Sequence, residues 1–216
     1  MFSGTRNTEI TVVWLDIRCA VSYVKEVSGW ILKGINGVIQ SIEQAEIERT
    51  IKAILDARAN KILLLGTGRS GFVGRAFALR LMHLGFNVYV SGETITPALS
   101  KQDLVIAISG SGTTTTVVAQ AAVADSIGAK VIAVTSHPES RLSTYADQIV
   151  TIKGRTKIDQ DFDYDRRQIA GEYDNAPLGT MFELSVMVFL DSVIADLMHR
   201  LGMTEIDLKK RHANAE

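Results

Sequence analysis

The chain contains 216 residues, of which 46% are hydrophobic, and its 23 Lys and Arg residues are balanced by 24 Asp and Glu residues. This length can bury one sizeable core but is short for two, so we expect a single domain over residues 1–216. The balanced charge offers no positive surplus to hold a nucleic acid, and the apolar runs are far shorter than the ~20 residues of a membrane-spanning helix, so neither nucleic acid nor a membrane is an expected partner.

The first stretch of the chain is predicted to be helical. No proline occurs between about Ile10 and Asn60, and apolar residues recur there at roughly helical spacing: Val24, Val27, Ile31, Ile35, Val38 and Ile42. We therefore expect a helical N-terminal arm over residues 1–44, followed by a core from about residue 45 to residue 200.

Short apolar runs and helical stretches then alternate. The runs predict five strands, at 61–65, 87–90, 104–109, 130–135 and 148–152, and the stretches predict helices at 72–84 and 115–127. Two runs, Val105–Ile108 and Val131–Val134, are apolar without alternation, which burial on both faces by crossover helices produces. The pattern indicates an α/β fold with a doubly wound parallel sheet.

The last third of the chain divides into a charged segment and two helices. Between Gly154 and Ala176 the composition turns charged and periodicity fades, which predicts a solvated excursion and a candidate lid. One helix is expected from 181 to about 200, ended by Gly202, and a C-terminal helix within 203–216. The helix at 181–200 is apolar over much of its circumference, so we expect it and the N-terminal arm to pack between subunits.

Few residues suit a metal or a disulfide. The chain has one cysteine, Cys19, and four scattered histidines, so no internal disulfide and no Cys/His metal cluster is expected. Acidic Glu9 and Asp16 stand where a signal peptide would have a basic flank and an unbroken apolar stretch. We therefore expect a cytoplasmic protein without a metal.

Two loops follow predicted strands and carry the residue types that hold a phosphate. In open parallel sheets, ligands bind outside the carboxyl ends of the strands. Gly66–Gly71 reads GTGRSG and offers unhindered amides, a helix N-terminus and the side chains of Arg69 and Ser70 beside Gly68. The second loop, Ser109–Thr114, offers hydroxyl groups from Ser109, Ser111, Thr113 and Thr114. The alternative is that such loops are turns with helix N-caps, but two furnished loops favour a phosphate cradle.

The first loop also fits the G-x-G-x-x-G pattern of dinucleotide-binding proteins. Glu93 stands about twenty residues beyond its last glycine, where a ribose-binding acid is expected. A dinucleotide needs only one such loop, whereas the second loop suits a terminal monophosphate, and Glu93 follows Ser91 and Gly92 beyond the expected strand end. We therefore expect no nicotinamide cofactor.

The order of motifs resembles the SIS, or sugar isomerase, domain over roughly residues 45 to 200. The motifs are Gly66–Ser70, Ser109–Thr114 and Val134–Ser136, each after a strand. Further segments resemble the 6-phospho-3-hexuloisomerase family within that superfamily: Arg80–Gly85, Gly92–Thr94, Pro177–Glu183 and Arg211–Ala213. The resemblance implies a three-layer αβα fold with a five-stranded parallel sheet and a helical N-terminal arm.

The resemblance also implies an activity. Members of that family interconvert D-arabino-hex-3-ulose 6-phosphate and fructose 6-phosphate in the ribulose monophosphate pathway, as tetramers without a cofactor. It implies Glu183 as the catalytic base of an enediol mechanism, His83 and His212 as assisting groups, and Glu93 as a further substrate contact beside the two loops. A phosphorylated hexulose and further copies of this chain are the expected partners.

Glu183 has a second interpretation. Thr180-x-x-Glu183 is a capping box before an apolar run, a common start of a helix, and the pattern alone favours that role. Catalysis is favoured by the resemblance and by the apolar neighbour Phe182, since partial desolvation would raise the pKa of the carboxyl toward the working range.

The histidines also carry alternatives. His83 stands among apolar residues and fits a structural role as well as a catalytic one, and His212 fits either a solvated terminal helix or a contribution to a neighbouring subunit's site. His137 and His199 are interpreted as surface residues. The main alternative function is a non-catalytic or differently specific SIS module that binds a phosphosugar, which would keep both loops and lack the base.

Overall fold

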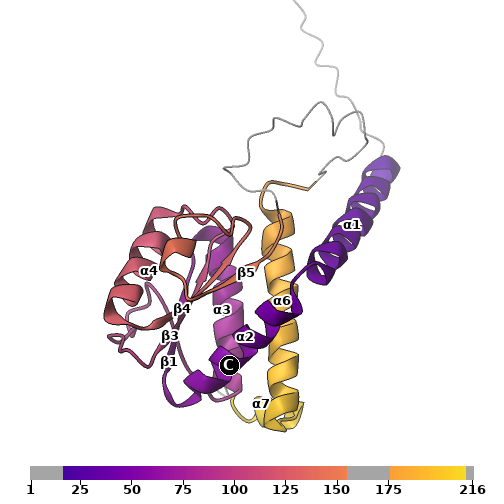
Figure 1. Ribbon diagram of the computed structural model, residues 1–216. Coiled ribbons are helices and arrows are strands. Elements are labelled where there is room, and N and C mark those ends of the chain that lie inside the picture. Colours follow the sequence, from indigo (N-terminus) through magenta and orange to yellow (C-terminus); the bar gives the residue numbers. More distant parts are fainter. Residues whose placement is uncertain (1–16, 155–175, 213–216) are drawn as a thin grey trace, which may run out of the picture.

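A computed structural model describes residues 17–154 and 176–212 of the chain (Figure 1). The residues of the N-terminal arm before 17, nearly all of the predicted charged excursion, and the last four residues of the predicted C-terminal helix lie outside the described residues. The candidate lid therefore stays a prediction.

The centre of the fold is a parallel sheet of five strands in the order β2-β1-β3-β4-β5. The strands are β1 (Lys61–Leu65), β2 (Asn87–Val90), β3 (Leu104–Ile108), β4 (Lys130–Thr135) and β5 (Gln148–Thr151), each within one residue of its predicted bounds. The strand order reverses between β1 and β3, so the loops that follow these two strands flank the point where parallel sheets bind ligands.

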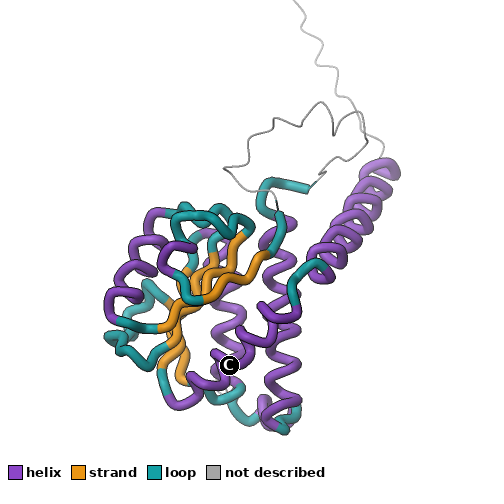
Figure 2. Tube along the Cα trace, in the orientation of Figure 1, coloured by secondary structure: helices purple, strands orange, loops and turns teal. Residues whose placement is uncertain are grey.

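Helices cover both faces of the sheet, which gives three layers (Figures 1 and 2). The helices α2 (Gln44–Asp56), α3 (Gly68–His83) and α6 (Thr180–Leu201) lie on one face, where Leu64 and Ile106 belong to their core. The helix α4 (Thr115–Ile127) lies on the other, where Leu63 and Val105 belong to a second core. The predicted α/β class, the parallel sheet and the flanking helices are confirmed.

The described part of the N-terminal arm forms one helix, α1 (Ile17–Gln40), and a turn. α1 packs on α6, and the short turn leads into α2, which belongs to the core (Figure 1). Within the described part of the chain, α6 is contacted by α1, α2 and α3, and many of its apolar residues are buried there. The apolar circumference of α6 is thus largely covered inside one chain, and it gives less reason for a subunit contact than the sequence suggested.

The start of α3 differs from the prediction. The helix was expected to begin at Phe72, after the glycine loop, but it begins at Gly68, directly after Thr67. Gly68 has φ +57°, a conformation open mainly to glycine, and it turns the chain from β1 straight into the helix. Arg69 and Ser70 therefore stand in the first helical turn, where backbone N–H groups lack partners within the helix.

The remaining elements are short. The 3₁₀ turns η1 (Ala57–Ala59) and η2 (Ser143–Tyr145) precede β1 and β5, and α7 (Glu205–Lys209) lies within the range 203–216 expected for the C-terminal helix. α7 starts with a capping box in which Asp207 accepts hydrogen bonds from the backbone N–H and the hydroxyl of Thr204.

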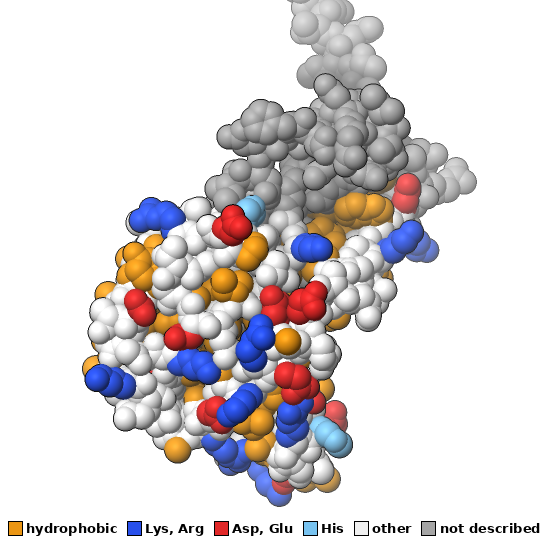
Figure 3. Space-filling view, in the orientation of Figure 1, with side chains coloured by type: hydrophobic (Ala, Val, Ile, Leu, Met, Phe, Trp, Pro, Cys, Tyr) orange, Lys and Arg blue, Asp and Glu red, His pale blue; other side chains and the backbone are white. Residues whose placement is uncertain are grey.

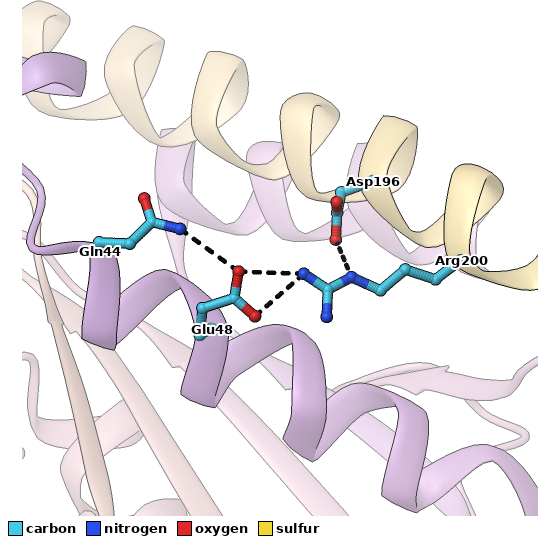
Figure 4. Close-up of polar contacts among 4 residues, drawn as sticks. All are labelled: Gln44, Glu48, Asp196 and Arg200. Carbon is cyan, nitrogen blue, oxygen red and sulfur yellow. Dashed lines mark hydrogen bonds and ion pairs between the residues drawn. The ribbon is translucent and has the colours of Figure 1, made fainter.

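Charged side chains tie α2 to α6 at the surface (Figure 4). Glu48 accepts hydrogen bonds from Gln44 and from the guanidinium of Arg200, which also donates to Asp196. These groups are exposed, so the network adds little to stability.

Charges of both signs are interspersed over the face shown in Figure 3, as the balanced composition predicts. Among the described helices, none combines the length and hydropathy that a membrane span requires.

Candidate active site

A cavity of about 470 Å³ lies at the carboxyl end of the sheet, at the reversal point between β1 and β3. Three segments line it: the first turn of α3, the loop after β3 and the start of α6. The lining residues are Thr67, Gly68, Arg69, Ser70, Gly110, Ser111, Thr114, Leu178, Gly179, Phe182 and Glu183. The structure thus brings both predicted loops and Glu183 to one place.

The loop after β1 is folded tightly on itself. A Cβ atom on Gly71 would lie 2.9 Å from the carbonyl oxygen of Gly66, so the close approach needs glycine. This fold leaves Gly68, Arg69 and Ser70 as lining residues at the N-terminal end of α3. Backbone amides and the positive end of the helix dipole therefore border the cavity, a surrounding that suits an anion.

Hydroxyl groups of the loop after β3 pair with one another. The hydroxyl groups of Ser109 and Thr114 are 3.0 Å apart, and the hydroxyl of Thr113 donates to that of Ser111 at 3.1 Å. Ser111 and Thr114 line the cavity, whereas Ser109 is buried and Thr113 does not line it. Two of the four predicted hydroxyls thus face the site, and the other two support them.

Glu183 points toward Arg69 and does not cap α6. The N-cap of α6 is Gly179, with φ +87°, so Thr180 is the first helical residue and Glu183 the fourth. No side chain caps this helix, and the Glu183 carboxylate accepts a hydrogen bond from Arg69 Nε and forms an ion pair with it. The predicted capping box is therefore absent, which leaves the carboxylate available to the cavity.

The two partners of this ion pair differ in exposure. The Glu183 side chain is 13% exposed and that of Arg69 is 61% exposed. The apolar Leu178 and Phe182 line the same cavity. A carboxylate with little exposure beside backbone amides and hydroxyl groups is an arrangement that suits general base catalysis.

The family model of the SIS domain matches residues 57–162. The 3-hexulose-6-phosphate isomerase of Bacillus subtilis is 36% identical over 186 residues, which cover 86% of this chain and 95% of that protein. The chain belongs to the SIS-domain family that includes the 3-hexulose-6-phosphate isomerases.

Two further comparisons agree with this family. An uncharacterised protein of Methanothermobacter thermautotrophicus is 48% identical over 179 residues, covering 82% of this chain and 89% of that protein. The crystal structure of a hypothetical protein from Methanococcus jannaschii, from which a function of 3-hexulose-6-phosphate isomerase was inferred, superposes with a TM-score of 0.71 at 35% identity. The superposition covers 90% of this chain and 99% of the other. These SIS-family relatives support an isomerase.

His83 and His212 lie together, away from the cavity of this SIS domain. Their rings stack with centroids 3.9 Å apart, where the end of α3 meets the residues after α7. His83 is 14 residues beyond Arg69 along α3, which is about 21 Å at the rise of a helix. Within one chain, therefore, the structure separates both predicted histidines from Glu183.

The surroundings of His83 disfavour its charged form. The side chain is buried, and among the described residues its Nδ1 atom has no hydrogen-bond partner. Burial, followed by the nearby His212 and Arg80, holds the pKa of His83 below its usual value of 6.5. Arg211 packs over Gly85 next to this stack, so two segments that carried the family resemblance contact each other at the end of α3.

Glu93 is placed outside the cavity lining. It follows β2 in a turn, and its carboxylate accepts hydrogen bonds from the guanidinium of Arg75 at 2.9 and 3.2 Å. Both side chains of this ion pair are 50% exposed. The structure therefore gives Glu93 a surface partner, and its predicted contact with substrate stays a prediction.

Four residues that line the cavity of this SIS-family protein were not among the predicted substrate contacts. Thr67 and Gly110 belong to the two predicted loops, and Leu178 and Phe182 belong to the segment Pro177–Glu183. His137, interpreted as a surface residue, hydrogen bonds to the carbonyl of Gly110. One signal was available, since His137 comes two residues after β4 and thus at the same edge of the sheet as the two loops. His199 is exposed on α6, as predicted.

Proposed function

We propose that this SIS-family protein interconverts D-arabino-hex-3-ulose 6-phosphate and fructose 6-phosphate. The observation that carries the proposal is the Glu183 carboxylate, paired with Arg69 inside a cavity bordered by two amide- and hydroxyl-rich loops. Relatives named 3-hexulose-6-phosphate isomerase, at 36% and 40% identity, support this substrate.

The phosphoryl group binds between the two loops. Gly68 and Ser70 at the start of α3, with Ser111 and Thr114 before α4, supply the amides and hydroxyls, and Ser109 and Thr113 hold those hydroxyls in place. Both helices present their N-termini to this volume, which favours a dianion. The carbon chain of the sugar then extends toward α6 and Glu183.

Isomerisation moves the carbonyl from C3 to C2 through an enediol. Glu183 removes the proton from C2, electrons shift to form a C2–C3 double bond, and the carbonyl oxygen at C3 gains a proton. The hydroxyl at C2 then gives up its proton as the new carbonyl forms, and Glu183 returns a proton to C3. One base serves both transfers, and the reaction involves no net oxidation or reduction.

Arg69 positions the base, Glu183, in this mechanism. Its guanidinium forms an ion pair and a hydrogen bond with the Glu183 carboxylate. The pair also fixes the carboxylate in the cavity in the absence of substrate. His83 and His212 could assist only the site of a neighbouring subunit, because in their own chain they lie at the other end of α3.

The deciding experiment supplies D-arabino-hex-3-ulose 6-phosphate and follows fructose 6-phosphate in the presence of a chelator. We expect turnover that the chelator leaves unchanged. Binding of the phosphosugar without turnover would instead favour a non-catalytic SIS module, and turnover only on another phosphosugar would favour a differently specific isomerase.

We also propose that the chain self-associates, as a tetramer, through the outer side of α3. Phe72, Leu79 and Met82 are exposed there by 66%, 52% and 39%, and their spacing puts them on one stripe of the helix. Light scattering should report an oligomer for the parent chain and a smaller species for Leu79→Asp. Val123→Asp, at a 58% exposed position on α4 across the sheet, is the matched control. A monomeric parent at micromolar concentration would refute this proposal.

A further inference from the structure

The loop after β3 (residues 109–114) accepts hydrogen bonds from the end of β4 and the segment that follows it (residues 135–142). Three donors converge on the carbonyl oxygen of Gly110: the Thr135 hydroxyl at 3.2 Å, the Ser136 N–H at 3.0 Å and His137 Nδ1 at 3.1 Å. A carbonyl oxygen can only accept, so Nδ1 of His137 carries a proton and donates it. His137 thus fixes the orientation of a residue that lines the cavity.

The same segment holds a second carbonyl of the loop. The Leu142 N–H donates to the carbonyl oxygen of Gly112 at 2.9 Å, and a Cβ atom on Gly112 would lie only 1.9 Å from the hydroxyl of Ser140. The carbonyl oxygens of Gly110 and Gly112 are therefore both engaged by residues 135–142. Carbonyl oxygens would repel a phosphate dianion, so this arrangement removes two of them from its surroundings.

The orientation of the Gly110 carbonyl determines that of the next amide. No peptide bond in the described residues is cis, and in a planar trans peptide the N–H of Ser111 points opposite to the carbonyl of Gly110. Within the described parts of the chain, this N–H donates to no protein acceptor. Both Gly110 and Ser111 line the cavity, so a ligand there can accept from it.

We propose that His137 is a positioning residue that aims the Ser111 N–H at the phosphoryl group of the substrate. The proposal rests on the proposed function only in taking a phosphorylated sugar as the ligand. His137 does this through Gly110 and touches no reacting atom. Its loss would weaken phosphate binding and leave the proton transfers at Glu183 unchanged.

Three substitutions of His137 differ in whether they keep a hydrogen-bond donor at the position of Nδ1. The side-chain amide nitrogen of asparagine can occupy the place of Nδ1, so His137→Asn keeps a donor for the Gly110 carbonyl. In His137→Gln the amide lies one carbon further out and corresponds to Nε2, and His137→Ala has no donor. His199→Ala, at an exposed position on α6, is the matched control.

The test measures steady-state kinetics on D-arabino-hex-3-ulose 6-phosphate, and Kd for fructose 6-phosphate and for inorganic phosphate by calorimetry. We expect His137→Ala and His137→Gln to raise KM and Kd about tenfold, the size of one lost hydrogen bond to a charged group, with kcat within about twofold of the parent. His137→Asn should return both constants to within about twofold of the parent.

The remaining outcomes separate the possibilities. Equal Kd values in all four variants would overturn the proposal, and so would a lower kcat at unchanged Kd, because that places His137 in the chemistry. If His137→Ala does not fold, the Asn and Gln variants, compared at matched thermal midpoints, still test the proposal. A higher Kd in His137→Gln than in His137→Asn would support it, and equal Kd values would overturn it. If the parent binds fructose 6-phosphate without turning over the hexulose phosphate, the proposed reaction fails and the Kd comparison still tests His137. A parent that binds neither phosphate ligand would refute both.

Discussion

The helices α6 and α7 begin with the same pattern, a threonine followed three residues later by an acid, and use it differently. In α7, Thr204 is the N-cap and Asp207 closes a capping box. In α6, Gly179 is the N-cap, Thr180 is already helical, and Glu183 is paired with Arg69 in the cavity. A shift of one residue at the cap thus separates a carboxylate that caps its own helix from one that pairs with Arg69 in the cavity.

The largest effect is expected from Glu183→Gln, which tests whether the Glu183 carboxylate acts as a base or as a helix cap. We expect kcat on D-arabino-hex-3-ulose 6-phosphate to fall by about 10²–10⁴-fold, the usual contribution of a positioned base, while the thermal midpoint changes little because no cap is lost. Glu48→Gln, an exposed and ion-paired acid on α2 outside the cavity lining, is the control. Retained turnover with lower stability would instead restore the capping role.

A second change alters the cap itself. Gly179 has φ +87°, and a Cβ atom there would lie 3.3 Å from Oε1 of Glu183. Gly179→Ala should therefore cost about 1–2 kcal/mol of unfolding free energy and lower kcat roughly tenfold by displacing the carboxylate.

Gly202→Ala is the matched control for that change. Gly202 ends the same helix with φ +62°, but a Cβ atom there would meet nothing within 4 Å. We expect a similar loss of stability with unchanged kcat, measured by denaturant unfolding and steady-state kinetics. Equal losses of activity in both variants would show that α6 responds as a whole and that the cap has no special effect.

The residues after α7 supply the next test, through the stack of His212 on His83. The pKa of His83 lies below 6.5 in the folded chain, mainly through burial, so its contribution to stability is full above pH 6.5 and is lost as the pH falls through the folded pKa. His83→Phe keeps a ring and removes the titration, so its stability should fall less than that of the parent below pH 6.5. Urea unfolding across pH 5–8 would measure this, and a large loss of kcat would support the predicted catalytic role.

The smallest effect is expected at the α7 capping box. A hydrogen bond from Lys210, with those from Thr204, lowers the pKa of Asp207 from 3.8 to about 2. The stabilisation is complete above pH 3.8 and is lost as the pH falls toward 2, so the thermal midpoints of parent and Asp207→Asn should converge over that range. Glu205→Gln, in the same turn, is the control. It removes a negative charge and leaves the capping box of Thr204 and Asp207 intact. Activity should not change in either variant.

The sequence predicted most of the fold because its signals are local. Unbroken apolar runs such as Val105–Ile108 predicted the strands, and the Gly/Ser/Thr sequences after β1 and β3 predicted the two loops that line the cavity. The start of α3 was misplaced because Gly68 and Gly71 are poor helix formers, and here a close approach between backbones overrides that propensity.

The side-chain contacts of the site could not be predicted from the sequence, because they join segments that are distant in the chain. No spacing indicates that Arg69 meets Glu183, 114 residues away, or that His83 meets His212 instead of the cavity. The role of His137 likewise depends on the parallel pairing of β3 with β4, which brings residue 137 to Gly110. Periodicity finds the elements, and only their packing determines which side chains share a site.

The placement of the two loops has a consequence for how the protein reaches its working form. β1 and β3 are neighbours in the sheet but are separated in the chain by α3 and β2, and Glu183 arrives from a helix beyond β5. No contiguous fragment that lacks any of these pieces carries a complete cavity. The phosphosugar site that we propose is therefore complete only in the folded chain, and a bound sugar would favour the folded state by mass action.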